Sequence, residues 1–279
     1  MTEGGRADAS HTGAPTSARA ITKDATVELR EGGALWLTLQ RPAARNAMTF
    51  AMYDVLEQTA IRANEDESVK ALVVTGSGGA FIAGTDIAQF AEFRSAEQAH
   101  AYEERMERVL GALEAVRKPT IAAIGGAATG GGLAIAAACD LRVATAVATF
   151  GMPIARTLGN CLALANLVRL SALIGLARTK ELVFTSRIIS ADEAESFGLL
   201  NEVVADDVAL LARVDELARL MAAHAPLTLW ATKEGLRRIR ERMLPDEGRD
   251  LVALCYTSAD FQEGVKAFIE KRKPWWTGR

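Results

Sequence analysis

The sequence has few of the residues that hold metals or form disulfides. Its three cysteines, Cys139, Cys161 and Cys255, are far apart, form no Cys-x-x-Cys pair and have no histidine nearby. Zinc sites need several Cys or His ligands at short spacings, so we expect no metal site. An odd number of scattered cysteines is also untypical of a disulfide framework. These features predict reduced thiols and a cytoplasmic protein.

The chain also lacks a block of like charges and a long apolar run. Lys and Arg total 32 against 35 Asp and Glu, the formal net charge is −3, and no run of five or six basic residues occurs. Nucleic acid is therefore not an expected partner. Residues 1–20 hold no apolar stretch of the roughly 7 to 15 residues that a signal peptide needs. Residues 121–139 are uncharged but rich in Gly and Ala, so no membrane span is expected.

The chain does contain enough apolar residues for a large core, since 49% of its 279 residues are hydrophobic. Its apolar patterns alternate between strands and helices, which predicts an α/β fold with parallel crossovers. The predicted strands are 27–29, 34–39, 70–75, 120–124 and 141–145, and the predicted helices are 49–64, 95–116 and 130–138. Beyond Asn160 we expect helices only, with capping boxes at Ser190 and Asp260. The expected organisation is a disordered tail over 1–20, an α/β core over 21–200 and a helical region over 201–279.

Two glycine-bearing segments each follow a predicted buried strand, one at 81–87 and the other at 125–132. Each would place free backbone N–H groups at the start of a helix, where they stabilise negative charge on an oxygen. Two such groups that converge form an oxyanion hole, whereas the alternative is a pair of tight packing corners. Neither segment ends in Gly-Lys-Ser/Thr, and no Gly-x-Gly-x-x-Gly follows the first strand, which excludes nucleotide-binding loops.

The order of several short motifs resembles the crotonase superfamily, the enoyl-CoA hydratases and isomerases. The motifs are RPAARNAM at 41–48, AFIAGTDI at 80–87, KPTIAAI at 118–124, GGG at 130–132, CD at 139–140, FGMP at 150–153, SADEA at 190–194, GL at 198–199 and EGVKAFIEKR at 263–272. The resemblance covers about 26–275. It implies a spiral of ββα units with a C-terminal helical trimerisation region, assembled as a trimer or a dimer of trimers.

The resemblance also implies an enzyme, a lyase or isomerase of fatty acid metabolism, whose substrate is an acyl-CoA thioester. Coenzyme A would enter as part of the substrate, and no permanently bound cofactor is implied. The implied oxyanion hole consists of the backbone N–H groups of Thr85 and Gly131. The implied CoA contacts are Thr85, Asp86, Ile87 and Ala88 along the arm, Arg45 and Ala47 near the nucleotide end, and Phe268 and Lys271 at a neighbouring subunit's CoA. Gly131 is also implied to contact the substrate.

Both glutamates that the hydratases use are missing. In the family, one lies two residues after the glycine triplet and the other follows the proline of FGMP; here these positions hold Ala134 and Ile154. A positioned acid or base is typically worth about 10² to 10⁴ in rate, so ordinary hydration is not expected. Candidate replacements are Glu103 and Glu104 on the helix at 95–116, and Arg156, which could clamp a substrate carboxylate. The alternative is that all three are solvated or ion-paired surface charges.

Two classes of function remain open. The first is an enzyme that stabilises a thioester enolate. It is either a decarboxylase, which needs no protein base, or an isomerase or hydratase with a relocated acid or base. The second is a non-catalytic acyl-CoA-binding protein that kept the fold and lost the chemistry. A serine hydrolase is excluded because no convincing Ser-His-Asp set is present.

Overall fold

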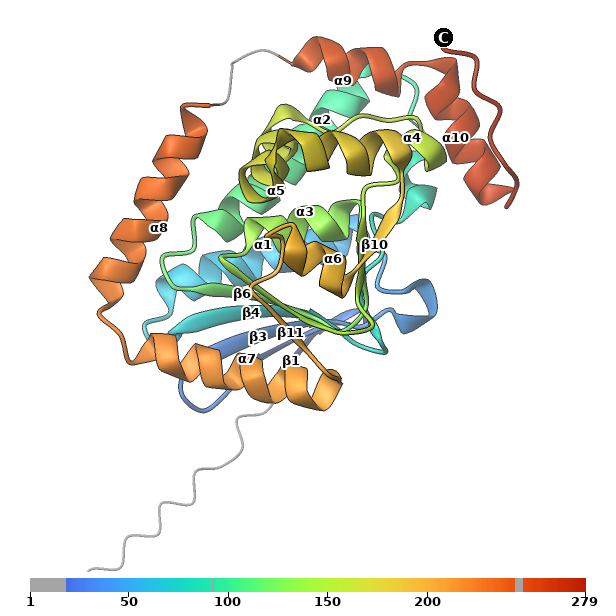
Figure 1. Cartoon of the computed structure of the whole chain (residues 1–279). Helices are drawn as coiled ribbons and strands as arrows, with labels where there is room; N and C mark the ends of the chain where they lie inside the picture. The colour runs from blue at the N-terminus through green and yellow to red at the C-terminus, as the bar shows by residue number, and fades with distance from the viewer. Residues whose placement is uncertain (1–18, 92, 244–247) are drawn as a thin grey trace, which may run out of the picture.

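The computed structural model describes residues 19–91, 93–243 and 248–279, which form two sheets enclosed by helices (Figure 1). The predicted tail over 1–20 lies outside the described residues, except that Arg19 and Ala20 begin the first strand, β1 (Arg19–Thr22). None of the helices in the described ranges is long and apolar enough to cross a membrane.

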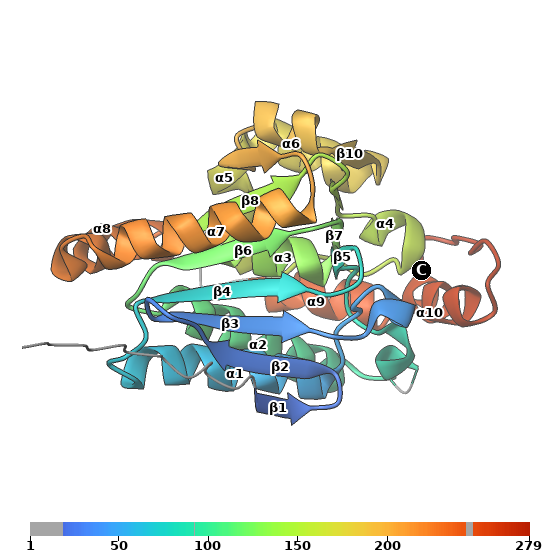
Figure 2. The same cartoon turned by 90° about the horizontal axis from the view of Figure 1, so that it is seen from below.

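The main sheet has seven strands in the order β1-β2-β3-β4-β6-β8-β11, and Figure 2 shows most of them side by side. Strand β1 pairs antiparallel with β2 (Ala25–Leu29), and β2 pairs antiparallel with β3 (Ala34–Leu39). From β3 onward the pairing is parallel, through β4 (Ala71–Gly76), β6 (Thr120–Ile124), β8 (Leu141–Thr145) and β11 (Glu202–Val204). Strands buried on both faces need continuous apolar runs, which is why β4 and β6 were recognisable from sequence.

A second sheet of four short strands has the order β10-β9-β7-β5. It consists of β5 (Ala80–Ile82), β7 (Ala127–Thr129) and β9 (Thr149–Gly151), which are parallel, and β10 (Ile188–Ser190), which is antiparallel to β9. Each main-sheet strand β4, β6 and β8 is followed by one strand of this sheet and then by a helix. The chain therefore forms the spiral of ββα units that the resemblance implied.

Helices cover both faces of the main sheet. Figure 1 shows α1 (Phe50–Glu65), α2 (Ala96–Glu114) and α3 (Gly131–Ala138) on one side and α7 (Asp207–Ala222) on the other. Thr49 caps α1 by accepting a hydrogen bond from the Met52 N–H. Buried Leu210 and Val214 of α7 pack against Trp36 and its neighbours in the sheet. The remaining helices are η1 (Pro42–Ala44), η2 (Ile87–Phe90), α4 (Ile154–Thr157), α5 (Leu164–Thr185), α6 (Ala191–Ser196), α8 (Pro226–Glu241), α9 (Arg249–Tyr256) and α10 (Ala259–Ile269).

The expectation that strands end before Asn160 is wrong. Strands β10 and β11 both follow it, and β11 extends the main sheet beyond residue 200 by pairing with β8. Three residues are too few to show a periodic pattern, so the open edge of β8 decides this strand rather than local sequence. The capping box at Ser190 is present in its first half, because the Ser190 hydroxyl accepts from the Glu193 N–H. At α10 the cap is Ser258, two residues before the predicted Asp260.

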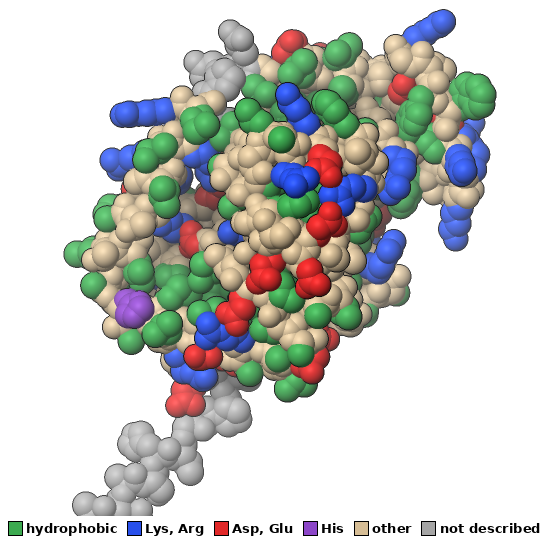
Figure 3. Space-filling model, in the orientation of Figure 1, with side chains coloured by type: hydrophobic (Ala, Val, Ile, Leu, Met, Phe, Trp, Pro, Cys, Tyr) green, Lys and Arg blue, Asp and Glu red, His purple; other side chains and the backbone are tan. Residues whose placement is uncertain are grey.

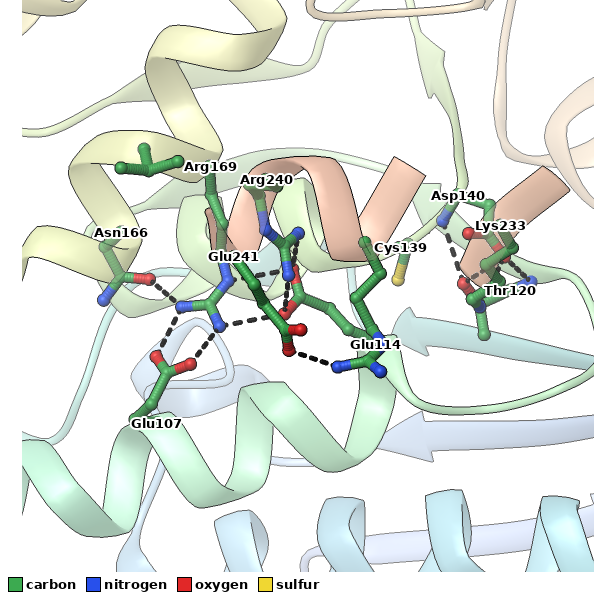
Figure 4. Close-up of polar contacts among 12 residues, drawn as sticks. Glu107, Glu114, Thr120, Cys139, Asp140, Asn166, Arg169, Lys233, Arg240 and Glu241 are labelled. Carbon is green, nitrogen blue, oxygen red and sulfur yellow. Dashed lines mark hydrogen bonds and ion pairs between the residues drawn. The ribbon is translucent and has the colours of Figure 1, made fainter. Parts of the chain in front are cut away.

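Helix α8 is attached to the body by charged groups. It buries none of its residues, and its apolar side chains Leu227, Leu236 and Ile239 are largely exposed. Figure 3 shows such hydrophobic side chains along this helix. Its Arg240 joins Arg169 of α5 in binding the carboxylate of Glu114 on α2 (Figure 4). Earlier in α8, the Lys233 Nζ lies 2.7 Å from the Asp140 carboxylate.

Candidate active site

A cavity of about 490 Å³ lies beyond the carboxyl ends of β5 and β7. Its walls come from the segments that follow these two strands, from residues within 43–47 and 160–163, and from α1, α2, α3, α4, α5, α9 and α10. Most of the lining is apolar, including Met106, Leu110 and Leu162. A cavity of this size, apolar with a few polar groups, is typical of a small-molecule site.

The segment after β5 is fixed by the chain that runs beside it. The Met48 N–H donates to the Gly84 carbonyl at 2.9 Å, and the Asp86 N–H donates to the Met48 carbonyl at 2.9 Å. These two bonds flank Thr85, whose own N–H meets no acceptor among the described residues. Beside them, Asn46 is fully buried and donates from Nδ2 to the carbonyls of Ser77 and Ala80. The Thr85 N–H is thus left free on a rigid loop.

The glycine triplet begins α3 and approaches the same loop. Gly130 has a φ of 53° and a ψ of −121°, a conformation that residues with side chains avoid, and its N–H donates to Gly151. Gly131 is the first residue of the helix, so its N–H has no partner within the helix. A Cβ atom on Gly131 would lie 3.6 Å from the Thr85 nitrogen. Gly131 therefore lies beside Thr85 at the cavity wall, and neither residue's N–H has an acceptor in the part of the chain that the structure describes.

Ala134 and Ile154, which replace the family's two glutamates, both line the cavity and are buried. A carboxyl group nevertheless reaches this space from α2. Glu103 is half-buried and lines the cavity, and its Oε1 accepts a hydrogen bond of 2.5 Å from the Tyr256 hydroxyl. Loss of water around Glu103 raises its pKa to about 7; the hydrogen bond from Tyr256 opposes this shift and the charge of Glu107 adds to it.

All three tyrosines of the protein line this cavity. The Thr85 hydroxyl lies 2.8 Å from the Tyr53 hydroxyl and 3.2 Å from the Tyr102 hydroxyl. Burial raises the pKa of Tyr53 to about 12, so this phenol stays protonated. Sequence reasoning missed Tyr53 and Tyr256, because the first fits the apolar face of α1 and the second lies in a region expected to serve assembly. The one signal in the sequence for these residues was that the chain contains few tyrosines.

The other two candidates for acid or base lie outside the cavity. Glu104 is exposed and forms an ion pair with Arg249, also exposed. Successive residues of a helix point about 100° apart, so only one of two adjacent glutamates on α2 faces inward. Arg156, on the short helix α4, is exposed and does not line the cavity. Neither residue is placed where the sequence interpretation needed it.

The predicted CoA contacts divide into two groups. Arg45, Ala47, Thr85, Asp86, Ile87, Gly131 and Phe268 line the cavity, whereas Ala88 and Lys271 do not. Phe268 lies at the cavity of its own chain, and its side chain is half exposed. The Asp86 carboxylate binds Arg41 at 3.0 Å and caps η2 through the Ala88 N–H.

No group of three or more His, Cys, Asp or Glu side chains within the described ranges could hold a metal ion. Cys161 lines the cavity, but loss of solvation raises its pKa well above the ordinary thiol value. A thiol that stays protonated is a poor nucleophile.

A family model described as enoyl-CoA hydratase/isomerase matches residues 30–279 of this chain. Among curated relatives, a 2,3-dehydroadipyl-CoA hydratase of Escherichia coli is 35% identical, with 90% of this chain and 97% of the relative covered. A crotonyl-CoA hydratase of Syntrophomonas wolfei is 36% identical, with 85% and 92% covered. Among solved structures, a methylmalonyl-CoA decarboxylase in complex with 2-nitronate-propionyl-CoA superimposes with a TM-score of 0.83. It is 26% identical, with 92% of this chain and 99% of that chain covered.

Proposed function

The chain belongs to the enoyl-CoA hydratase/isomerase family. We propose that it moves a proton along the acyl chain of an enoyl-CoA thioester, and that Glu103 serves as both the acid and the base. The observation that carries this proposal is the Glu103 carboxyl group in a cavity where Ala134 and Ile154 replace the family's two carboxylates. The expected reaction is a shift of the double bond from the β,γ to the α,β position.

The reaction balances with one carboxyl group. The thioester oxygen accepts hydrogen bonds from the N–H groups of Thr85 and Gly131. The Glu103 carboxylate takes a proton from the α carbon, and the electrons of that C–H bond pass to the thioester oxygen, whose negative charge the two donors stabilise. The Glu103 carboxyl then returns the proton to the γ carbon, and the double bond forms between the α and β carbons.

Hydration places a different demand on the site, because one group must activate water while the substrate also gains a proton. Asp86 is the other carboxylate among the described cavity-lining residues, and it is paired with Arg41. Glu103 is then the one carboxyl group among these residues that has no ion-pair partner, and a single such group supports isomerisation better than hydration. The pKa of Glu103, about 7, also supports it, because both protonation states are then populated near neutral pH.

Decarboxylation is the second candidate function, favoured by the similarity to the methylmalonyl-CoA decarboxylase structure. Loss of carbon dioxide from a malonyl-type thioester leaves its bonding electrons as the same kind of enolate. No base is needed for that step, and protonated Glu103 would then supply the proton to the α carbon.

The experiment compares Glu103→Gln with Glu104→Gln, a matched control one position away on the exposed face of α2. The substrates are a 3-enoyl-CoA, a 2-enoyl-CoA and a malonyl-type thioester, each followed by chromatography of the products. We expect 3-enoyl-CoA turnover to fall by about 10² to 10⁴ in Glu103→Gln and to persist in Glu104→Gln. Full activity of Glu103→Gln would exclude Glu103 as the acid or base. Tight calorimetric binding without turnover of any thioester would favour the non-catalytic alternative.

We also propose that the chain assembles as a homotrimer or a dimer of trimers. Support comes from large apolar side chains that remain exposed on α5 and α8, among them Leu176, Phe184 and Leu227, each at least 70% exposed. Exposed apolar groups of this number are typical of an interaction surface. The cavity-lining residues that the family resemblance connects with CoA, Arg45, Ala47, Ile87 and Phe268, are proposed to contact the CoA portion of the substrate.

A further inference from the structure

We propose that Tyr256 is a positioning residue that holds the Glu103 carboxyl in its working orientation through a donated hydrogen bond, and that Asn160 in turn orients Tyr256. The inference rests on the proposed role of Glu103. Because Tyr256 is the last residue of α9, the inference means that a C-terminal helix contributes to the active site of its own chain.

The direction of the hydrogen bonds follows from counting protons. Asn160 donates from Nδ2 to the Tyr256 hydroxyl oxygen at 3.1 Å. The hydroxyl proton of Tyr256 is therefore free to point at Glu103, whose Oε1 lies 2.5 Å away. A carbonyl oxygen also accepts hydrogen bonds, so Tyr256 keeps its hold on Glu103 after the carboxyl takes up a proton.

The ring of Tyr256 is itself fixed by packing. The residue is 1% exposed, and its ring centre lies 4.8 Å from that of Phe261 and 6.2 Å from that of Tyr102. Phe261 in turn contacts Phe90 edge to face. A glutamate side chain on its own has several rotatable bonds, so a donor that cannot move restricts where its carboxyl group lies.

The second carboxyl oxygen of Glu103 has no hydrogen-bond partner within the described part of the chain, which leaves it available to the substrate. Burial raises the pKa of Tyr256 well above the ordinary value, so its hydroxyl remains a donor at every working pH. The titratable groups that influence Glu103, or that Glu103 influences, are Tyr53 on α1, Tyr102 and Glu107 on α2, Cys161 before α5, and Tyr256 on α9. Among them, Tyr256 alone donates a hydrogen bond to Glu103.

The test replaces Tyr256 by Phe, which removes the hydroxyl and keeps the ring. The pKa of Glu103 is measured in the full-length protein by carbon-13 NMR of labelled glutamate, and its signal is assigned by its loss in Glu103→Gln. A hydrogen bond to a charged group stabilises it by about 1.5 to 3 kcal/mol, or roughly one to two pH units. We expect Tyr256→Phe to raise the pKa of Glu103 by about one unit or more. The acid limb of the kcat/KM profile should move upward with it, and kcat should fall more than KM changes.

Tyr102→Phe is the matched control, because its hydroxyl bonds to Thr85 and not to Glu103. It should leave the pKa of Glu103 unchanged, whatever it does to the rate. If Tyr256→Phe does not fold, Asn160→Ala takes its place, since loss of the amide donor should raise the pKa of Glu103 by a smaller amount.

An unchanged pKa of Glu103 in folded Tyr256→Phe would overturn the positioning role. That failure differs from failure of the proposed function. If Glu103→Gln retains turnover, Glu103 is not the acid or base, and the NMR titration alone decides whether Tyr256 positions it. If Glu103→Gln is inactive while Tyr256→Phe shifts neither the pKa nor the acid limb, the positioning role alone is wrong.

Discussion

Replacing Glu103 by glutamine should stabilise the folded protein at alkaline pH. The pKa of Glu103 is raised from 4.5 to about 7, mainly by loss of water around the carboxyl. Below pH 4.5 the carboxyl is neutral in both the folded and the unfolded chain and has no effect on folding. As the pH rises, the unfolded chain loses this proton first, so stability is lost progressively until the folded carboxyl ionises at about pH 7.

The size of the effect follows from the shift. At about 1.4 kcal/mol per pH unit, the change from 4.5 to about 7 corresponds to at most about 3.5 kcal/mol above pH 7. Glutamine keeps an oxygen that accepts the hydrogen bond from Tyr256 and carries no charge to desolvate. Glu103→Gln should therefore melt roughly 5 to 10 °C above the unmodified protein at about pH 8. At about pH 5 the difference should fall to below about 1 kcal/mol.

The assay is thermal unfolding of both proteins at several pH values and one protein concentration, because assembly would make the midpoint concentration-dependent. Glu104→Gln serves as the control, since Glu104 is exposed and paired with an exposed arginine. A Glu103→Gln variant whose midpoint follows that of the unmodified protein at every pH would refute the reasoning, because Glu103 would then be solvated like a surface carboxylate.

Three further outcomes are expected. Gly131→Pro removes the proposed oxyanion donor, whereas Gly131→Ala keeps it, and both variants add a Cβ atom near Tyr53. Turnover should therefore be about 10² to 10³ lower in the proline variant than in the alanine variant. Equal rates in the two folded variants would exclude this donor. Glu114→Ala leaves Arg169 without one of its carboxylates, so chemical denaturation should show a loss of about 3 to 5 kcal/mol, against less than about 1 kcal/mol for exposed Glu241→Ala. Light scattering at micromolar concentration should give a trimer or a hexamer, and a monomer would contradict the proposed assembly.

Much of the fold could be predicted because its signals are local. The strands β4 and β6 are unbroken apolar runs, and Thr49 marks the start of α1 with the side chain that caps it. Strand β11 could not be predicted, because it consists of three residues that become a strand only beside β8. The cap of α10 was misplaced because Ser258 and Asp260 both suit the role, and Asp260 instead accepts hydrogen bonds from Thr277 and Gly278.

The site was harder to predict than the fold, because more of it depends on contacts between residues distant in sequence. The glycine segments were visible in the sequence, and their position at neighbouring strand ends follows from parallel pairing. The choice between Glu103 and Glu104 depends on which face of α2 meets the cavity, and that is set by the packing of helices distant in sequence. The partner of Glu103 lies 153 residues away on α9, and no spacing rule connects two such positions.

The second sheet explains why the two proposed donors lie together and why they number two. Strands β5, β7 and β9 pair in parallel, with Ile82 beside Ala128 and Ala128 beside Phe150. Three residues beyond these partners the chain reaches Thr85, Gly131 and Pro153, one on each successive turn of the spiral. Thr85 and Gly131 thus occupy the same position on two successive turns of the spiral. Because the turns stack, their backbone N–H groups become neighbours. Proline has no N–H, so the row of donors ends at its third place.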